Sequence, residues 1–191
     1  MENETMQSLN HESMVYPPII EKLALAISKL LPIKFYATDT FSTISNVKDL
    51  TEKLKLDEEI YYLCIVSKFS GSVDVHSLIF MDMSSTDELL CYLTGRHVKI
   101  LNRFEKSALQ ELANIIIGTV VSEMSRRLNI QISYTIPDIV IGLPSHLMDF
   151  FTKFIGSKKL YISVFKVTSG ELGVELLISL MAPLEDGDFF A

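Results

Sequence analysis

The chain has 191 residues, of which 48% are hydrophobic, and it carries 24 acidic against 17 basic residues for a net charge of -7. This apolar content excludes an intrinsically disordered chain, because there is enough hydrophobic surface to offset the entropy lost on folding. The length excludes a large multidomain enzyme. The acidic balance argues against non-specific binding of nucleic acid, which needs a surplus of lysine and arginine.

The charge and the apolar runs predict three segments. Residues 1–16 are expected to be a mobile leader, 17–182 a single domain and 183–191 an acidic tail. Six of the seven excess negative charges lie in the leader and the tail, at Glu2, Glu4, Glu12, Glu185, Asp186 and Asp188. The start carries no secretory signal, and the longest apolar runs reach about half a membrane span. We therefore expect a soluble, cytoplasmic protein without membrane insertion.

The sequence of the first half predicts a helix at residues 17–31, a strand at 33–39 and a short helix at 47–54. A β-hairpin at 60–81 and another short helix at 86–95 follow. Asn46 is placed to cap the second helix, and the turn sequence at 69–72 joins the hairpin strands. Ser85, followed by Glu88, resembles a capping box, and Gly95 stands where a C-cap glycine belongs.

The second half begins with the longest predicted helix, which ends at Leu128. Asn102 can cap this helix, because Glu105 follows three residues later. Four strands are then predicted, at residues 130–136, 138–142, 160–167 and 173–181. A helical connection at 146–155 separates the first two strands from the last two. The last of these strands is a candidate edge for a homodimer.

A weak internal repeat links the two halves. Four residues recur at an offset of 99: Gly71, Val75, Leu78 and Ile79 match Gly170, Val174, Leu177 and Ile178. A helix followed by a strand also recurs, although chance agreement between apolar strands is an alternative. The pattern predicts an α+β pseudo-twofold domain with two long helices packed on an antiparallel sheet.

The long helix carries a narrow polar stripe opposite its apolar face. At 100° per residue the stripe consists of Ser107, Glu111, Asn114, Gly118, Ser122 and Ser125. Glu111 and Asn114 project side by side, and Gly118 permits a close approach. A solvated helix face is the ordinary interpretation, but such faces usually carry longer charged side chains. The small residues around one acid and one amide favour docking against another surface.

Residues 107–142, SALQELANIIIGTVVSEMSRRLNIQISYTIPDIVIG, resemble the signature of the CheC/CheX/FliY family of chemotaxis phosphatases. The matching positions are Ser107, Glu111, Asn114 and Pro137, while Ala113 stands where the family often has glycine. The resemblance extends over nearly the whole chain after the leader. The counterparts of Glu111 and Asn114 in the first half are Met14 and Pro17. The single motif therefore resembles CheX rather than CheC.

The resemblance implies a phosphatase that hydrolyses the aspartyl phosphate of a CheY-type response regulator and so terminates chemotaxis signalling. Asn114 would orient the attacking water, and Glu111 would bind the lysine of the regulator's active site. Ser107, Gly118 and Ser122 would contact the partner, and Pro137 would be structural. The regulator would supply Mg²⁺, so no cofactor of the chain's own is expected. Dimerisation, as in CheX relatives, is also expected.

Two other functions fit the same sequence. The stripe could serve a non-catalytic module that binds a receiver domain or a flagellar switch component. A ligand-sensing domain of similar fold would instead need a closed apolar pocket. A metal site is not expected, because the four histidines and two cysteines lack ligand spacing.

Overall fold

A seven-stranded antiparallel sheet forms the centre of the computed structural model, which describes residues 19–72, 74–98, 100–156 and 159–184. Its strands are β1 (Tyr36–Ser45), β2 (Tyr62–Gly71), β3 (Val75–Asp82), β4 (Ile132–Tyr134), β5 (Asp138–Gly142), β6 (Leu160–Ser169) and β7 (Val174–Pro183). They lie in the order β1-β6-β7-β3-β2-β4, and β5 also pairs with β2. The first strand therefore lies later in the chain than the predicted 33–39.

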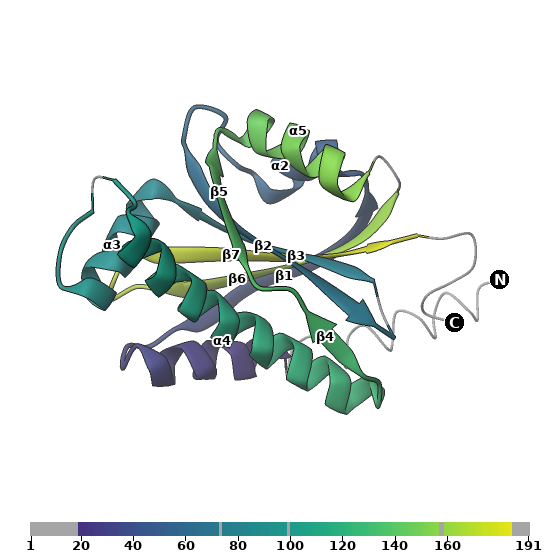
Figure 1. Cartoon of the computed structure of the whole chain (residues 1–191), viewed down its shortest axis with the longest axis horizontal. Coiled ribbons are helices and arrows are strands. Elements are labelled where there is room, and N and C mark those ends of the chain that lie inside the picture. Colours follow the sequence, from purple (N-terminus) through teal and green to yellow (C-terminus); the bar gives the residue numbers. More distant parts are fainter. Residues whose placement is uncertain (1–18, 73, 99, 157–158, 185–191) are drawn as a thin grey trace.

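Helices cover both faces of this sheet. They comprise a helix over residues 19–30, the 3-10 turn η1 (Val47–Asp49), α2 (Leu50–Leu54), α3 (Met83–Thr94), α4 (Arg103–Leu128) and α5 (Pro144–Ile155). The helix at 19–30 and α4 lie on one face, whereas α2 and α5 lie on the other (Figure 1). The α+β prediction is confirmed, and the second helical layer adds to the two long helices that were expected.

The strands separate two hydrophobic cores because their side chains alternate between the faces. On β3, Ile79 and Met81 face the long helices, while Leu78 and Phe80 face α5. All of these side chains are buried. Burial on both faces explains why the central strands are almost continuously apolar in sequence.

The strand pairing has the predicted pseudo-twofold character. Ile79 pairs with Ile178, and these two residues are also repeat counterparts at the offset of 99. The sheet order is symmetric about this β3–β7 contact, with β6 and β2 flanking it and β1 opposite β4 and β5. The two halves of the chain are thus interleaved rather than adjacent.

Several sequence predictions need correction. The strand β7 is not a sheet edge, because it pairs with β6 on one side and with β3 on the other. A dimer that extends the sheet would have to use β1 or the β4–β5 side. Asp82, not Ser85, is the N-cap of α3: its carboxylate accepts a hydrogen bond from the Ser85 amide at 2.6 Å. The sequence favoured Ser85 because no loop separates β3 from α3, so Asp82, the true N-cap, is also the last residue of the strand.

The predicted segment boundaries can be compared with the structure only in part. The leader at 1–16 lies outside the described residues, as do residues 185–191 of the predicted acidic tail. The tail prediction began too early, because Pro183 is the last residue of β7. The Leu184 amide also donates a hydrogen bond to the Lys159 carbonyl at 3.0 Å.

Candidate functional site

The start of α4 is fixed by a reciprocal capping box, as the sequence predicted. The Asn102 side chain accepts a hydrogen bond from the Phe104 amide at 2.8 Å, and the Glu105 carboxylate accepts one from the Asn102 amide at 3.1 Å. Arg96 also donates to Glu105 at 2.7 Å. Burial acts to raise the pKa of the Glu105 carboxyl, but the hydrogen bonds that this carboxylate accepts from backbone amides and from Arg96 outweigh burial and lower the pKa. Because the capping box fixes the residue at which α4 begins, it also determines the direction in which each residue of the stripe faces.

The buried side of α4 packs against the sheet through a wide apolar surface. Leu109, Leu112, Ile116 and Val120 are almost completely buried there. The predicted apolar face is confirmed at these positions, but Leu128 at its end is 39% exposed. This packing leaves the opposite side of the helix, which we call the crest, facing solvent.

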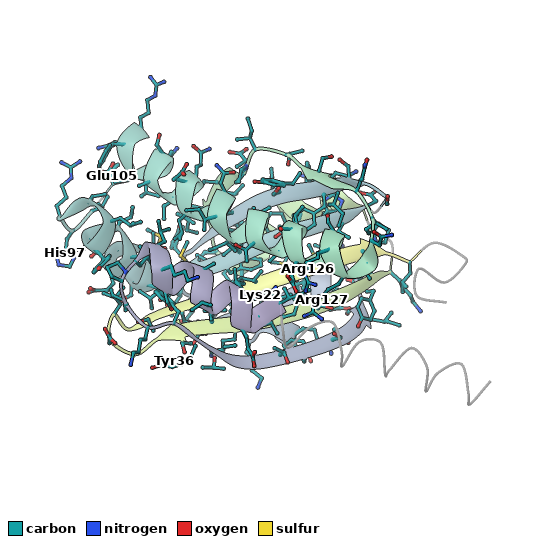
Figure 2. The ribbon with its side chains drawn as sticks, turned by 90° about the horizontal axis from the view of Figure 1, so that it is seen from below. Lys22, Tyr36, His97, Glu105, Arg126 and Arg127 are labelled. Atoms are coloured by element: carbon teal, nitrogen blue, oxygen red, sulfur yellow. The ribbon has the colours of Figure 1, made fainter. Side chains whose placement is uncertain are left out.

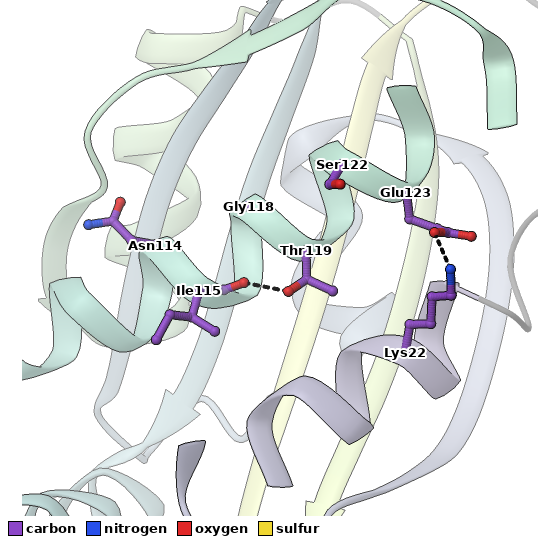
Figure 3. Close-up of a pocket in the computed structure, with 7 residues that line it drawn as sticks. All are labelled: Lys22, Asn114, Ile115, Gly118, Thr119, Ser122 and Glu123. Atoms are coloured by element: carbon purple, nitrogen blue, oxygen red, sulfur yellow. Dashed lines mark hydrogen bonds and ion pairs between the residues drawn. The ribbon is translucent and has the colours of Figure 1, made fainter. Parts of the chain in front are cut away.

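The predicted stripe lies on this crest. Ser107, Glu111 and Ser122 are exposed, and Asn114 and Gly118 are partly exposed. Figure 3 shows the Asn114 amide extending outward from α4. Among the described residues, neither Asn114 nor Glu111 has a recorded side-chain hydrogen bond or ion pair. Both groups are therefore available to an external partner.

A shallow hollow of about 490 Å³ runs along the side of the crest that faces the helix at 19–30 (Figure 3). Its lining consists of Lys22, Asn114, Ile115, Gly118, Thr119, Ser122 and Glu123 (Figure 3). Asn114, Gly118 and Ser122 occupy successive turns, so they line the hollow along its length. Glu111 and Ser107 lie toward the start of the helix, outside it. The structure thus brings together three of the five predicted site residues.

The hollow exists because the side chains on this part of the crest are small. The Thr119 hydroxyl turns back to the helix and donates to the Ile115 carbonyl at 2.7 Å. Gly118 has no side chain, and the Tyr134 hydroxyl of β4 approaches it from one side. A Cβ placed on Gly118 would lie 3.3 Å from that oxygen. The close approach predicted at Gly118 therefore includes a contact within the chain itself.

Lys22 and Glu123 form the end of the hollow that lies toward the C-terminus of α4. The Lys22 ammonium donates to the Glu123 carboxylate at 2.6 Å. Arg126 and Arg127 donate to the same carboxylate, each at 2.6 Å. The hydrogen bonds from Arg126 and Lys22 hold the pKa of Glu123 well below its usual range, against the effect of burial. No local sequence pattern predicts this cluster, because Lys22 is 101 residues away from Glu123.

Pro137 lies outside the hollow, in the short connection between β4 and β5. It is buried, and its carbonyl accepts a hydrogen bond from the Gln110 side chain of α4 at 3.0 Å. This bond ties the connection to the motif helix one residue before Glu111. The observed position agrees with a structural role for Pro137.

Among the residues that the structure describes, none of the helices combines the length and the apolar character that crossing a membrane requires. The same residues contain no group of three or more histidine, cysteine, aspartate or glutamate side chains arranged to hold a metal ion.

Part of the chain matches a known protein family. Residues 104–141, which extend from the first turn of α4 into β5, match the CheC-like family. This segment contains the whole predicted motif. A search of curated protein sequences finds no significant match.

Solved structures with the same fold come from chemotaxis and flagellar proteins. FliY of Thermotoga maritima is 14% identical, with a TM-score of 0.67 over 86% of this chain and 84% of FliY. A CheX of Desulfovibrio desulfuricans is 8% identical, with a TM-score of 0.58 over 87% of this chain and 97% of CheX. FliM of H. pylori, solved in a complex with SpeE, is 9% identical, with a TM-score of 0.62 over 92% of this chain and 88% of FliM.

The sequence match is local, whereas the structural likeness extends over most of the chain. The sequence match covers the motif helix and the two strands after it, while the shared fold extends over most of the chain. The predicted resemblance to the CheC/CheX/FliY family is therefore confirmed: residues 104–141 match the CheC-like family, and the fold of most of the chain is similar to those of solved FliY and CheX structures.

Proposed function

We propose that this chain is a phosphatase for the aspartyl phosphate of a CheY-type receiver domain. The observation that carries this proposal is the placement of Glu111 and Asn114 on the crest of α4, without recorded side-chain partners among the described residues. Side chains three residues apart on a helix project in nearly the same direction. A docked partner can therefore meet the carboxylate and the amide together.

The chemistry requires positioning more than covalent participation. An aspartyl phosphate is an activated acyl phosphate, and a water that attacks phosphorus in line displaces the aspartate carboxylate. The new P–O bond forms as the acyl P–O bond breaks, and the products are inorganic phosphate and free aspartate. The Asn114 carboxamide can accept a hydrogen bond from this water and donate one to a phosphoryl oxygen.

Glu111 provides the second anchor in this proposal. By family resemblance, a receiver supplies a lysine and Mg²⁺ beside its phosphoaspartate, and the Glu111 carboxylate would bind the lysine ammonium. Glu111 lies about one helical turn from Asn114. This contact would fix the angle at which the Asn114 amide enters the receiver. Gly118 and Ser122 then leave room for the partner's surface.

The proposal is tested by replacing Asn114. Asn114→Ala is expected to abolish stimulated loss of phosphate from a phosphorylated CheY-type receiver, while the fold survives because the amide makes no hydrogen bond within the part of the chain that the structure describes. Asn114→Asp keeps the size of the side chain but is expected to be equally inactive, because its carboxylate repels the phosphoryl group. Dephosphorylation by either variant at the wild-type rate would refute the mechanism.

Glu111→Gln should weaken the same reaction through loss of the ion pair with the receiver's lysine. Glu171→Gln is the matched control, because it removes the same charge from an exposed residue in the β6–β7 turn. A loss of activity in both variants would point to net charge rather than to a specific contact.

A non-catalytic binding module is the second candidate. The likeness to FliM, which was solved in a complex with another protein, favours this alternative. Turnover distinguishes the two functions: a phosphatase present at a substoichiometric amount clears many phosphorylated receivers, whereas a binding module does not. The ligand-sensing alternative has less support, since the hollow lies on the outside of α4 and polar side chains line much of it.

A further inference from the structure

Three cations surround one carboxylate at the end of the hollow farthest from Glu111. Lys22 comes from the N-terminal helix, while Arg126 and Arg127 come from the last turn of α4; all three donate to Glu123. Figure 2 shows these cations together at one end of α4, with Glu105 at the other end. Lys22 and Arg126 thus place two positive charges against the one negative charge of Glu123.

The burial of these groups makes the cluster positive toward solvent. The Glu123 side chain is 6% exposed, whereas those of Lys22 and Arg126 are 50% and 61% exposed. The exposed ammonium of Lys22 and guanidinium of Arg126 share this one buried carboxylate, so these three groups together carry one excess positive charge. The hollow therefore begins at a neutral amide, Asn114, and ends at a positively charged surface.

We propose that Lys22 and Arg126 form a second docking contact, which binds an acidic side chain on the receiver's surface. This inference rests on the proposed function, because it takes Asn114 as the group that enters the receiver. Arg126 lies twelve residues after Asn114, or about 18 Å along the helix axis. The acidic side chain should therefore lie at a similar distance from the phosphoaspartate. Receivers without an acid there would be poorer substrates.

This contact is expected to act on association rather than on the chemical step. Partly exposed charges at the rim of an interface steer encounter and change the salt dependence of binding. The cations do not reach the reacting atoms, so their removal should raise KM and leave kcat unchanged. Because Lys22 and Arg126 also contact a buried carboxylate, the experiment has to separate charge from folding.

The test compares Lys22→Gln, Arg126→Gln and the double variant with Lys153→Gln. Lys153 is exposed on α5, across the sheet from the hollow, so its replacement removes the same charge at a distant site. For each protein, kcat and KM are measured with a receiver phosphorylated by acetyl phosphate. Affinity for the same receiver trapped with beryllofluoride is measured calorimetrically at low and high salt.

The double variant should raise KM and Kd about threefold to tenfold at low salt, the range expected for two partly exposed ion pairs. The increase should shrink at high salt as the charges are screened. The control should behave as wild type. An unchanged Kd in the double variant, or an equal change in Lys153→Gln, would overturn the inference.

Glu123→Gln separates charge from structure, because it removes the buried negative charge and keeps all three cations. It should lower KM at low salt if the positive surface attracts the receiver. If it raises KM as the double variant does, the cluster acts only by holding the helices together, and the inference is wrong. Competition by millimolar inorganic phosphate would overturn it too, since the site would then bind a free anion.

The same measurements distinguish this inference from the proposed function. A wild-type chain that binds the trapped receiver without turning over phosphate would refute the phosphatase, while the salt-dependent Kd of the variants would still decide the docking contact. A wild-type chain that binds no CheY-type receiver would overturn both.

Discussion

Gly118→Ala should make the protein more stable and a poorer partner for its receiver. Glycine in the interior of a helix costs about 1 kcal/mol relative to alanine. The opposing cost comes from the Tyr134 hydroxyl, which would lie 3.3 Å from the new methyl group. That oxygen has to move by only a few tenths of an ångström, and Tyr134 is 38% exposed, so solvent allows the shift.

The net gain should therefore be roughly 0.5 to 1 kcal/mol, which corresponds to a rise in Tm of roughly 1 to 4 °C for a chain of this size. Function should change in the opposite direction, because the methyl group enlarges a residue that lines the hollow between Asn114 and Ser122. Urea unfolding measures the first effect. Calorimetric binding of a trapped receiver measures the second.

Gly170→Ala is the matched control for this substitution. Gly170 lies in the β6–β7 turn, and a Cβ there would meet nothing within 4 Å. It reports the general effect of alanine on the unfolded chain without touching α4. A loss of stability in Gly118→Ala would refute the argument that Tyr134 yields. A gain in stability with unchanged receiver affinity would refute the hollow as a docking surface.

Two further predictions concern the ends of α4. Asn102→Ala removes the N-cap and should lower the free energy of unfolding by about 1 kcal/mol; a variant with wild-type urea stability would contradict the importance of the cap. The Glu123 carboxyl has a lowered pKa in the folded protein, so its stabilising contribution is present above its unfolded pKa of about 4.3 and is lost as the pH falls toward the folded value. The free energy of unfolding should thus fall more steeply between pH 6 and pH 3 in wild type than in Glu123→Gln, and equal slopes would refute this assignment.

Local signals predicted most of the elements correctly. Asn102 with Glu105 marked the start of α4, and the turn between β2 and β3 marked a hairpin, because both features depend on residues close together in sequence. Gly95, with a φ of 77°, is the C-cap of α3 as predicted. The orientation of α4 followed from its apolar period, so the exposure of Glu111 and Asn114 was also predictable.

Features that depend on distant contacts were not predictable in this way. The central position of β7 follows from its pairing with β3, and nothing in its own sequence distinguishes a central strand from an edge that is covered by helices. The ion pairs of Glu123 were not predictable from local sequence, because its partner Lys22 lies far back in the chain. The hollow needed the side chains of two helices to be placed together.

The interleaved sheet also has a consequence for how the chain folds. The strand β1 pairs with β6, so the Thr38 hydroxyl contacts the Lys166 carbonyl across 128 positions of sequence. Each half provides the outer strand for the other half's hairpin, and neither half can complete its own sheet. Pairing over such distances slows folding and leaves strand edges exposed meanwhile. During synthesis, the first half should therefore depend on protection from aggregation until β6 and β7 have emerged.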